Sequence, residues 1–206
     1  MSNSTLLSNP FWRTLLERRS IRRTSAEPIP RAVLERLLTA AIWAPSAHNR
    51  QPWRFVVVTR GSDKRQLAEG MGRRWETDLV DAGVDAETAR SHSERSRARI
   101  MRAGATVVAC LNRKELERFP DERRQHLEWQ MGVQSVALAL QNLLLAAQHE
   151  GLGACWLCAP LFAPDEVRAA LALPADWEPQ ALITLGYPTE TRTSTRKPLE
   201  EVVVWR

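Results

Sequence analysis

The sequence predicts an α+β fold, because segments with helical spacing and segments typical of strands are intermixed without a regular βαβ alternation. Short runs rich in β-branched residues at 55–59, 105–111 and 180–185 predict buried strands. No glycine-rich phosphate loop follows the first of these runs, which argues against a doubly wound dinucleotide fold. At 206 residues and 44% hydrophobic content, the chain can bury one core. We therefore expect a single α+β domain over residues 1–206.

Proline and capping signals place the first helices. Asn9 followed by Pro10 predicts a helix start and a helix to about Arg19, because Asn caps free N–H groups and proline is tolerated at the first helical position. Pro30 opens a second helix that ends just after Trp43, ahead of Pro45. Its apolar positions recur at helical spacing: Val33, Leu34, Leu37, Leu38, Ala41 and Ile42.

The middle of the chain predicts a peripheral excursion and one long helix. Residues 78–102 are charged and broken by Gly83, which indicates helices at the periphery of the fold that could lie over a site. A helix from about Asp121 to Glu150 follows. Its polar residues come in pairs seven apart, at Gln134/Ser135, Gln141/Asn142 and Gln148/His149, so only a narrow stripe is polar and protein should surround the helix. Part of its surface should therefore meet a second subunit, and the apolar tail 199–205 could pack there too.

After this long helix the chain returns to the sheet. Gly151 and Gly153 end the helix and lead into a strand at 154–157, and Pro164 starts a short helix.

Composition narrows the possible partners. The formal charge of +5 comes mainly from arginine, a residue suited to phosphate and carboxylate recognition. Arginine and glutamate alternate through 90–102 and 115–128, so the charge is not gathered as nucleic-acid binding requires, and we expect no nucleic-acid partner.

Localisation signals are weak or missing in the sequence. The longest apolar stretch, Met131–Ala147, is interrupted by polar residues and predicts a buried helix instead of a membrane span. Met1–Asn9 lacks the pattern of a signal peptide, and three cysteines (Cys110, Cys155 and Cys158) are an odd number, which favours free thiols in a reducing compartment. We expect a cytoplasmic protein with no membrane partner.

Two segments contain side chains suited to binding a ligand. Arg18–Arg23 places four guanidinium groups and the hydroxyl of Ser20 at a helix end, where they could grip a phosphate, although a solvated basic turn is the alternative. Ala44–Trp53 is dense in small residues and donor-acceptor side chains, as the polar edge of a planar heterocycle requires, although an ordinary proline-bounded loop would look similar.

These two segments together resemble the N-terminal signatures of FMN-dependent nitroreductases. Three further segments, Met131–Ser135, Gly151–Trp156 and Arg196–Glu201, also look like that family and appear in the same order. The resemblance implies an intertwined homodimer around a central, mostly antiparallel sheet flanked by helices. It also implies FMN as cofactor, NADH or NADPH as electron donor, and ping-pong transfer of two electrons to a conjugated small-molecule acceptor such as a nitroaromatic, a quinone or a dehydro-deazaflavin.

The same resemblance assigns roles to residues. Arg18, Arg19, Ser20 and Arg22 would hold the ribityl phosphate, with Arg196 approaching it from the C-terminal part. The isoalloxazine would be lined from the partner subunit by Pro45, Ser46, Ala47, Asn49 and Gln51, and Leu157 and Cys158 would pass near its reactive edge. His48, Trp75 and Asp78 are candidates for the substrate side. We expect no catalytic side chain and no metal ligand, because the flavin carries the hydride chemistry.

Two alternatives concern the substrate and the cysteine pair. Arg74–Leu79 and Leu171–Pro179 resemble a branch of the family linked to deazaflavin coenzyme biosynthesis, typified by the nitroreductase-like C-terminal domain of FbiB. A specialised deazaflavin reductase and a non-catalytic flavin or deazaflavin binder are therefore alternative functions. Cys155-Trp156-Leu157-Cys158 has the spacing of a redox or metal motif, but no second Cys or Cys/His pair completes a zinc site. Its two cysteines also flank a strand-like run, unlike a thioredoxin-type dithiol.

Overall fold

The structure is a computed structural model and describes residues 6–206. Residues 1–5 lie outside the described residues, and with them the first part of the Met1–Asn9 segment and of the expected domain.

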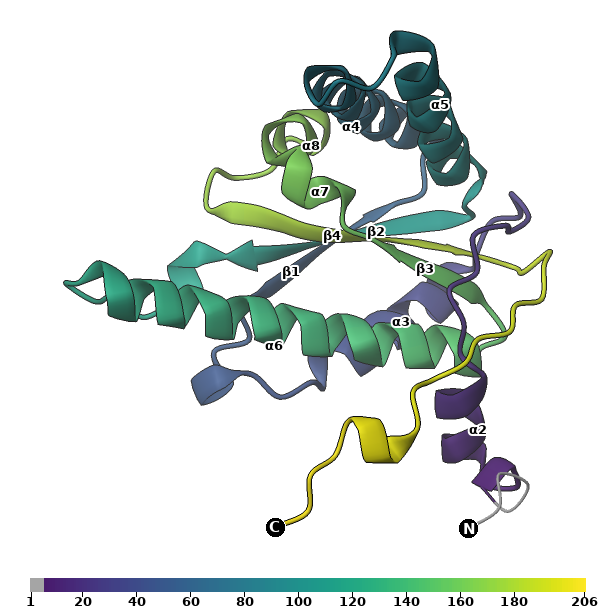
Figure 1. Cartoon of the computed structure of the whole chain (residues 1–206), viewed down its shortest axis with the longest axis vertical. Coiled ribbons are helices and arrows are strands. Elements are labelled where there is room, and N and C mark those ends of the chain that lie inside the picture. Colours follow the sequence, from purple (N-terminus) through teal and green to yellow (C-terminus); the bar gives the residue numbers. More distant parts are fainter. Residues whose placement is uncertain (1–5) are drawn as a thin grey trace.

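A four-stranded sheet forms the centre of the molecule. Its strands are β1 (Trp53–Val58), β2 (Ala105–Asn112), β3 (Gly153–Leu157) and β4 (Trp177–Gly186). They lie in the order β1-β2-β4-β3, and each neighbouring pair is antiparallel. Every residue of β2 is buried, because helices cover both faces of the sheet (Figure 1). The predicted α+β fold with an antiparallel sheet is therefore confirmed.

One face of the sheet is covered by α3 (Arg31–Ile42) and α6 (Glu122–His149), with α2 (Pro10–Glu17) packed on α6. Leu37, Leu140 and Leu143 lie in the core between these helices and the sheet. Asp121 accepts a hydrogen bond from Arg124 N at 2.9 Å and so caps α6, and Asn9 caps α2 through Phe11 N. These caps agree with the predicted helix starts, although α2 ends at Glu17 and not at about Arg19.

The other face carries α4 (Gly61–Asp81), α5 (Ala86–Arg102), α7 (Ala159–Phe162) and α8 (Pro164–Leu171). The predicted excursion is a helical hairpin, and Gly83, with a φ of 86°, lies in its turn. Helix α4 begins at Gly61, well before the expected start near Asp78. Leu67, Ala68 and Met71 recur at helical spacing and are buried against the sheet, so a signal for the earlier start was present in the sequence.

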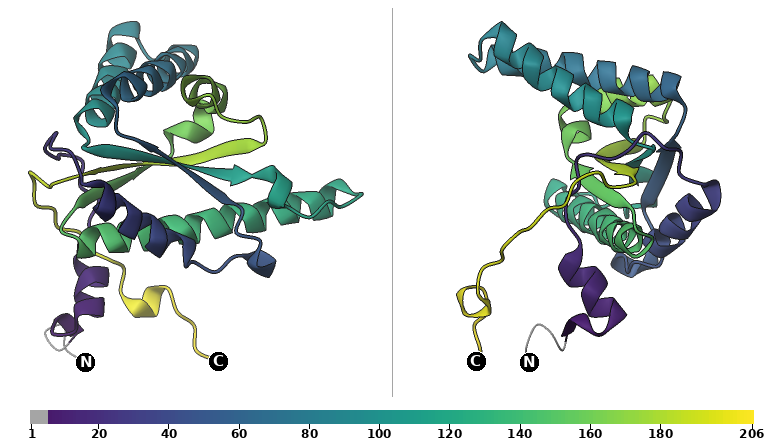
Figure 2. Two further views of the ribbon diagram at one scale, coloured as in Figure 1. Left: turned by 180° about the vertical axis from the view of Figure 1, so that it is seen from behind. Right: turned by 90° about the vertical axis from the view of Figure 1, so that its right-hand side faces the viewer.

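The long helix α6 is only partly surrounded by protein. Of its polar pairs, Ser135 and Asn142 turn inward, and Asn142 Nδ2 donates to Ala40 O on α3 at 3.1 Å. Leu127 and Leu138 are nearly half exposed in the single chain. The tail after β4 extends away from the sheet beside α2 and includes η3 (Leu199–Glu201), and Trp205 at its end is 85% exposed (Figure 2). No helix among the described residues is long and apolar enough to cross a membrane.

Candidate functional site

The Arg18–Arg22 segment is attached to the edge of the sheet. It follows the C-terminal end of α2, and Ser20 forms a parallel bridge with Ala154 of β3. Ile21 N donates to Ala154 O at 2.9 Å. A Cβ on Gly153 would come within 2.7 Å of the Ile21 side chain, so only glycine allows this close approach. The backbone of the segment is therefore fixed, while the Arg22 side chain and Ser20 face solvent.

Three arginines gather at this segment. The pKa of Arg18 is lowered, first by partial burial and then by the positive charges of Arg196 and Arg19. Arg196 lies far along the sequence in the C-terminal tail, and the fold brings it close enough for its charge to act on Arg18. Among the described residues, neither these three guanidinium groups nor that of Arg22 forms an ion pair with a carboxylate. Uncompensated like charges at a partly buried position favour binding of an anion.

Glu190 fixes the same segment from the other side. Its Oε1 accepts from Arg22 N at 2.8 Å and from Arg23 N at 3.2 Å, and its Oε2 pairs with Arg192 at 2.9 Å. The hydrogen bond from Arg192, followed by the one from Arg22 N, lowers the pKa of Glu190 to about 2. Sequence reasoning missed this residue, because a glutamate in a polar stretch gives no local sign of a distant backbone partner.

The Ala44–Pro52 loop has an unusual backbone. His48, Asn49 and Gln51 have φ values of 51°, 52° and 50°, in the left-handed region that favours glycine. The short η1 turn (Ala47–Asn49) carries two of them. Ser46 closes the loop on itself, since its Oγ accepts from Gln51 N and its carbonyl accepts from Asn49 N, both at 3.0 Å. Such a concentration of strained residues is typical of functional loops.

The loop presents polar groups to solvent. His48, Asn49 and Gln51 are exposed, and Gln51 Nε2 approaches Asn49 Oδ1 at 3.4 Å. Pro45 is exposed as well, and Ala47 N donates to Ser135 Oγ of α6 at 3.3 Å. The predicted ring-binding residues Pro45, Ser46, Ala47, Asn49 and Gln51 thus form one surface.

One chain does not bring the loop and the arginine segment together. The loop is bonded to Ser135 in the first half of α6, whereas the arginine segment is bonded to Ala154, beyond the end of α6 at His149. Ser135 and His149 are fourteen positions apart on the helix, which corresponds to about 20 Å along the axis. The turn η1 accordingly lies beside the N-terminal half of α6, and α2 lies near the C-terminal end of that helix (Figures 1 and 2).

Leu157 and Cys158 lie at the far end of the strand that carries the bridge to Ser20. Leu157 ends β3, three residues or about 10 Å beyond Ala154, and Cys158 follows as the exposed N-cap of α7. Trp156 Nε1 lies 3.2 Å from Cys158 Sγ. The arginine segment and these two residues therefore line one edge of a single chain.

The two cysteines of the motif point to different faces of the sheet. Trp156 packs against the core on the α6 side, so Cys155 and Leu157, its neighbours on the strand, face the α4 side. Burial raises the pKa of the Cys155 thiol. The hydrogen bond to Trp156 places the Cys158 sulfur on the other side, and both thiols are free. This arrangement does not favour a catalytic dithiol.

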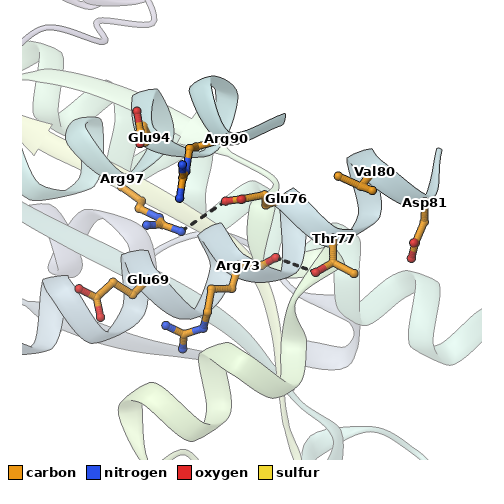
Figure 3. A pocket seen from close by; sticks show the side chains of 9 residues that line it. All are labelled: Glu69, Arg73, Glu76, Thr77, Val80, Asp81, Arg90, Glu94 and Arg97. Atoms are coloured by element: carbon orange, nitrogen blue, oxygen red, sulfur yellow. Dashed lines mark hydrogen bonds and ion pairs between the residues drawn. The ribbon is translucent and has the colours of Figure 1, made fainter. Parts of the chain in front are cut away.

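The substrate candidates on α4 lie on the other side of the sheet from the loop that carries His48. The Trp75 ring lies 6.0 Å from that of His92 on α5, and Asp78 pairs with Arg74 at 2.8 Å. Helix α4 packs against α7, next to Cys158. A hollow of about 590 Å³ also lies between α4 and α5, where arginines and acids face each other, as in the 3.7 Å pair of Arg97 and Glu76 (Figure 3). Neither Trp75 nor Asp78 lines this hollow.

Comparison with known proteins identifies the relatives of this chain. The model of the Nitroreductase family matches residues 15–187. A protein of Thermus thermophilus named NADH dehydrogenase is 36% identical over 203 residues, covering 93% of each chain. Iodotyrosine deiodinase 1 of Rattus norvegicus is 28% identical and covers 96% of this chain and 70% of its own. A crystal structure from Desulfovibrio desulfuricans, described as a nitroreductase in complex with FMN, superposes with a TM-score of 0.75 at 28% identity and covers 96% and 97% of the two chains.

Proposed function

The chain belongs to the nitroreductase family, and from that premise we propose that it is an FMN-dependent oxidoreductase that passes two electrons from NADH or NADPH to a conjugated small-molecule acceptor. The observation that carries the proposal is the gathering of Arg18, Arg19 and Arg196 beside Ser20 without a carboxylate partner among residues 6–206. The FMN complex of a 28% identical relative supports the cofactor, and the name of the Thermus relative supports the donor.

The residues present fit FMN. A ribityl phosphate would supply the negative charge that these arginines lack, and arginine forms strong charge-assisted bonds to phosphate. The exposed donors and acceptors of the Ala44–Pro52 loop suit the polar edge of an isoalloxazine ring. When bound, FMN supplies the hydride chemistry.

The protein's own side chains would orient the flavin and shield it from water. Arg18, Ser20, Arg22 and Arg196 would bind the phosphate end, with Arg19 adding positive charge. Leu157 and Cys158 at the end of β3 would lie against the reactive edge, and Pro45, Ser46, Ala47, Asn49 and Gln51 would line the ring. No side chain is assigned as a general acid.

A homodimer would complete the site. Because about 20 Å of α6 separates the loop from the arginine segment, the ring-lining loop would come from the partner subunit. An apolar groove of about 530 Å³ lies between α2, α3 and α6, where Phe11 is 64% exposed and Trp43 is 81% exposed. Exposed aromatic side chains around an apolar groove are typical of a subunit interface. We propose that this groove and the 199–206 tail are covered in an intertwined dimer of single-domain chains.

The acceptor is a narrower proposal. Because Arg74–Leu79 resembles the deazaflavin-linked branch, Trp75 and Asp78 on α4 would face the acceptor, and a dehydro-deazaflavin is a candidate beside nitroaromatics and quinones. Ping-pong kinetics would follow if one flavin site serves both half-reactions. A cytoplasmic location is proposed from the three free thiols.

Absorbance and anaerobic titration test the function. The purified protein should show oxidised-flavin bands that bleach with NADH or NADPH. Flavin that does not bleach would contradict the electron donor, and a colourless protein that cannot be reconstituted with FMN would overturn the proposal.

Complementation tests the shared site. At an FMN concentration that just saturates the wild type, chains carrying Arg18→Ala and Arg22→Ala should be largely empty, and so should chains carrying Ser46→Ala, Asn49→Ala and Gln51→Ala. Mixed dimers of the two would contain one site with all the changes and one with none, so they should bind about half the FMN of the wild type. If mixed dimers bind none, the loop and the arginines act in the same chain.

A further inference from the structure

Two buried polar side chains on α6 contact the strained Ala44–Pro52 loop. Glu128 is 2% exposed and Ser135 is 3% exposed, and both lie in a helix whose other buried residues are almost all apolar or small. Buried polar groups are expected to be hydrogen-bonded, and a buried carboxylate to be paired. The partners of these two residues therefore indicate what they do.

Ser135 holds the beginning of the loop. Its Oγ donates to Met131 O at 2.7 Å, one turn earlier in α6, and accepts from Ala47 N at 3.3 Å. The hydroxyl thus donates its single proton within the helix and uses a lone pair to accept the hydrogen bond from the loop. Ala47 directly precedes the left-handed residues His48 and Asn49.

Glu128 lies beneath the end of the loop. Its Oε1 accepts from Glu117 N at 3.0 Å and lies 3.9 Å from Nε of Arg50. The Arg50 Nε is buried and has no hydrogen-bond partner in the described part of the chain, while another Arg50 nitrogen pairs with the Glu117 carboxylate. Arg50 therefore lies between two carboxylates, and the charge of Glu128 offsets that of its buried nitrogen.

The helix sets the spacing of the two contacts. Glu128 and Ser135 are seven residues apart, two turns along one side of α6. Between them lies Gly132, where a Cβ would come within 2.9 Å of the Leu111 and Leu116 side chains. The glycine therefore lets α6 lie close to β2 and to the 113–117 segment that carries Glu117.

We propose that Glu128 and Ser135 are positioning residues. They hold the loop at Arg50 and at Ala47, respectively, in the strained conformation that binds the flavin ring. The inference rests on the proposed function, since it assigns a role to residues behind the proposed ring-binding surface. The left-handed residues would relax toward ordinary conformations if either contact were lost, because each is disfavoured by sterics. FMN would then bind only after the loop had been reordered.

Two single variants test the inference. Glu128→Gln keeps an oxygen for Glu117 N but removes the charge that faces Arg50, and Ser135→Ala removes the acceptor of Ala47 N. Each should weaken FMN binding roughly tenfold, as loss of one buried contact predicts. At saturating FMN, each should also alter the visible circular dichroism of the bound flavin, which reports the surroundings of the ring.

Matched controls separate positioning from general stability. Glu150→Gln removes an arginine–glutamate pair between α6 and α3 (Arg36, 2.6 Å) that does not contact the loop. Ser93→Ala removes a buried helix serine that donates to Gly72 O at 2.9 Å. Both controls should bind FMN within about twofold of the wild type, a change smaller than the loss of one hydrogen bond, even where their apo Tm falls as far as that of the test variants.

A double-mutant cycle adds a readout that a purely structural role would not move. Arg50→Ala combined with Glu128→Gln should weaken FMN binding less than the product of the single effects, because the two residues act through one contact. If the wild type binds FMN while both test variants match the controls, this inference is wrong and the proposed function stands. If the wild type itself fails to bind FMN, both are wrong.

Discussion

The two segments proposed to meet at the flavin are built in opposite ways. The Arg18–Arg22 segment has a backbone bonded to the edge of the sheet and an unbalanced charge, because Arg18, Arg19 and Arg196 have no carboxylate partner in the described part of the chain. The Ala44–Pro52 loop has paired charges and a strained backbone, with His48, Asn49 and Gln51 in the left-handed region. The first segment would recognise its ligand by charge, and the second would recognise it by the shape that its backbone conformation gives to the loop. Removing charge should therefore affect the first most, and changing backbone freedom should affect the second.

The largest effect is expected from Arg18→Ala combined with Arg22→Ala. Loss of two charge-assisted bonds to phosphate should weaken FMN binding by about a hundredfold or more. The apo Tm should stay the same or rise, since the removal of Arg18 relieves repulsion from Arg19 and Arg196. Fluorescence titration with FMN and thermal melting of the apo protein would measure both.

The matched control removes the same charge elsewhere. Arg31→Ala combined with Arg60→Ala eliminates two arginines in exposed ion pairs and should leave FMN affinity unchanged. If the control weakens binding as much as the test variant does, the effect is one of net charge and the phosphate assignment fails.

A smaller effect is expected from a substitution that relieves the backbone strain of the loop. Gln51→Gly should be more stable than Gln51→Ala by roughly 1 kcal/mol, because glycine accepts the φ of 50° that alanine does not. That difference corresponds to about 2–4 °C in Tm. Both variants lack the glutamine side chain, so a difference between them reports the backbone of the loop and not the lost amide. Equal melting temperatures would show that residue 51 is not strained in solution.

The smallest effect concerns Glu190, which fixes the backbone of the arginine segment. Its pKa of about 2 lies below the ordinary 4.5, so its stabilising contribution is complete above pH 4.5 and disappears as the pH falls toward 2. Glu190→Gln should lower Tm at pH 7 by on the order of 2 °C, as expected for a largely solvent-screened pair.

Melting the wild type and the Glu190→Gln variant between pH 7 and pH 3 would check the sign. The difference in Tm should narrow as the pH falls, whereas Glu35→Gln, in an exposed helical pair, should change Tm little at any pH. A difference that stays constant over this range would assign the effect to packing instead of charge.

Most of the fold could be predicted from local patterns. The strands, the caps at Asn9 and Asp121 and the breaks at Pro45 and Gly83 are all encoded within a few residues of where they act. The early start of α4 at Gly61 was missed, because its single buried stripe at Leu67, Ala68 and Met71 is short and surrounded by charge. The polar pairs of α6 were recognised as a pattern, but their partners Ala40 and Ala47 could not be identified.

The sequence alone therefore determined the α+β class, most of the helix and strand positions, and the two segments that carry the family's motifs, because each is a property of neighbouring residues. Only the tertiary structure decided that Arg196 joins Arg18, that Glu190 holds Arg22, and that Glu128 and Ser135 support a loop some eighty residues earlier in the chain. Only it showed that the loop lies over the N-terminal half of α6 while the arginine segment lies beyond the C-terminal end of that helix. Such contacts join residues far apart in the sequence, and the packing of helices on a sheet, which creates them, leaves no mark in the local pattern of either partner.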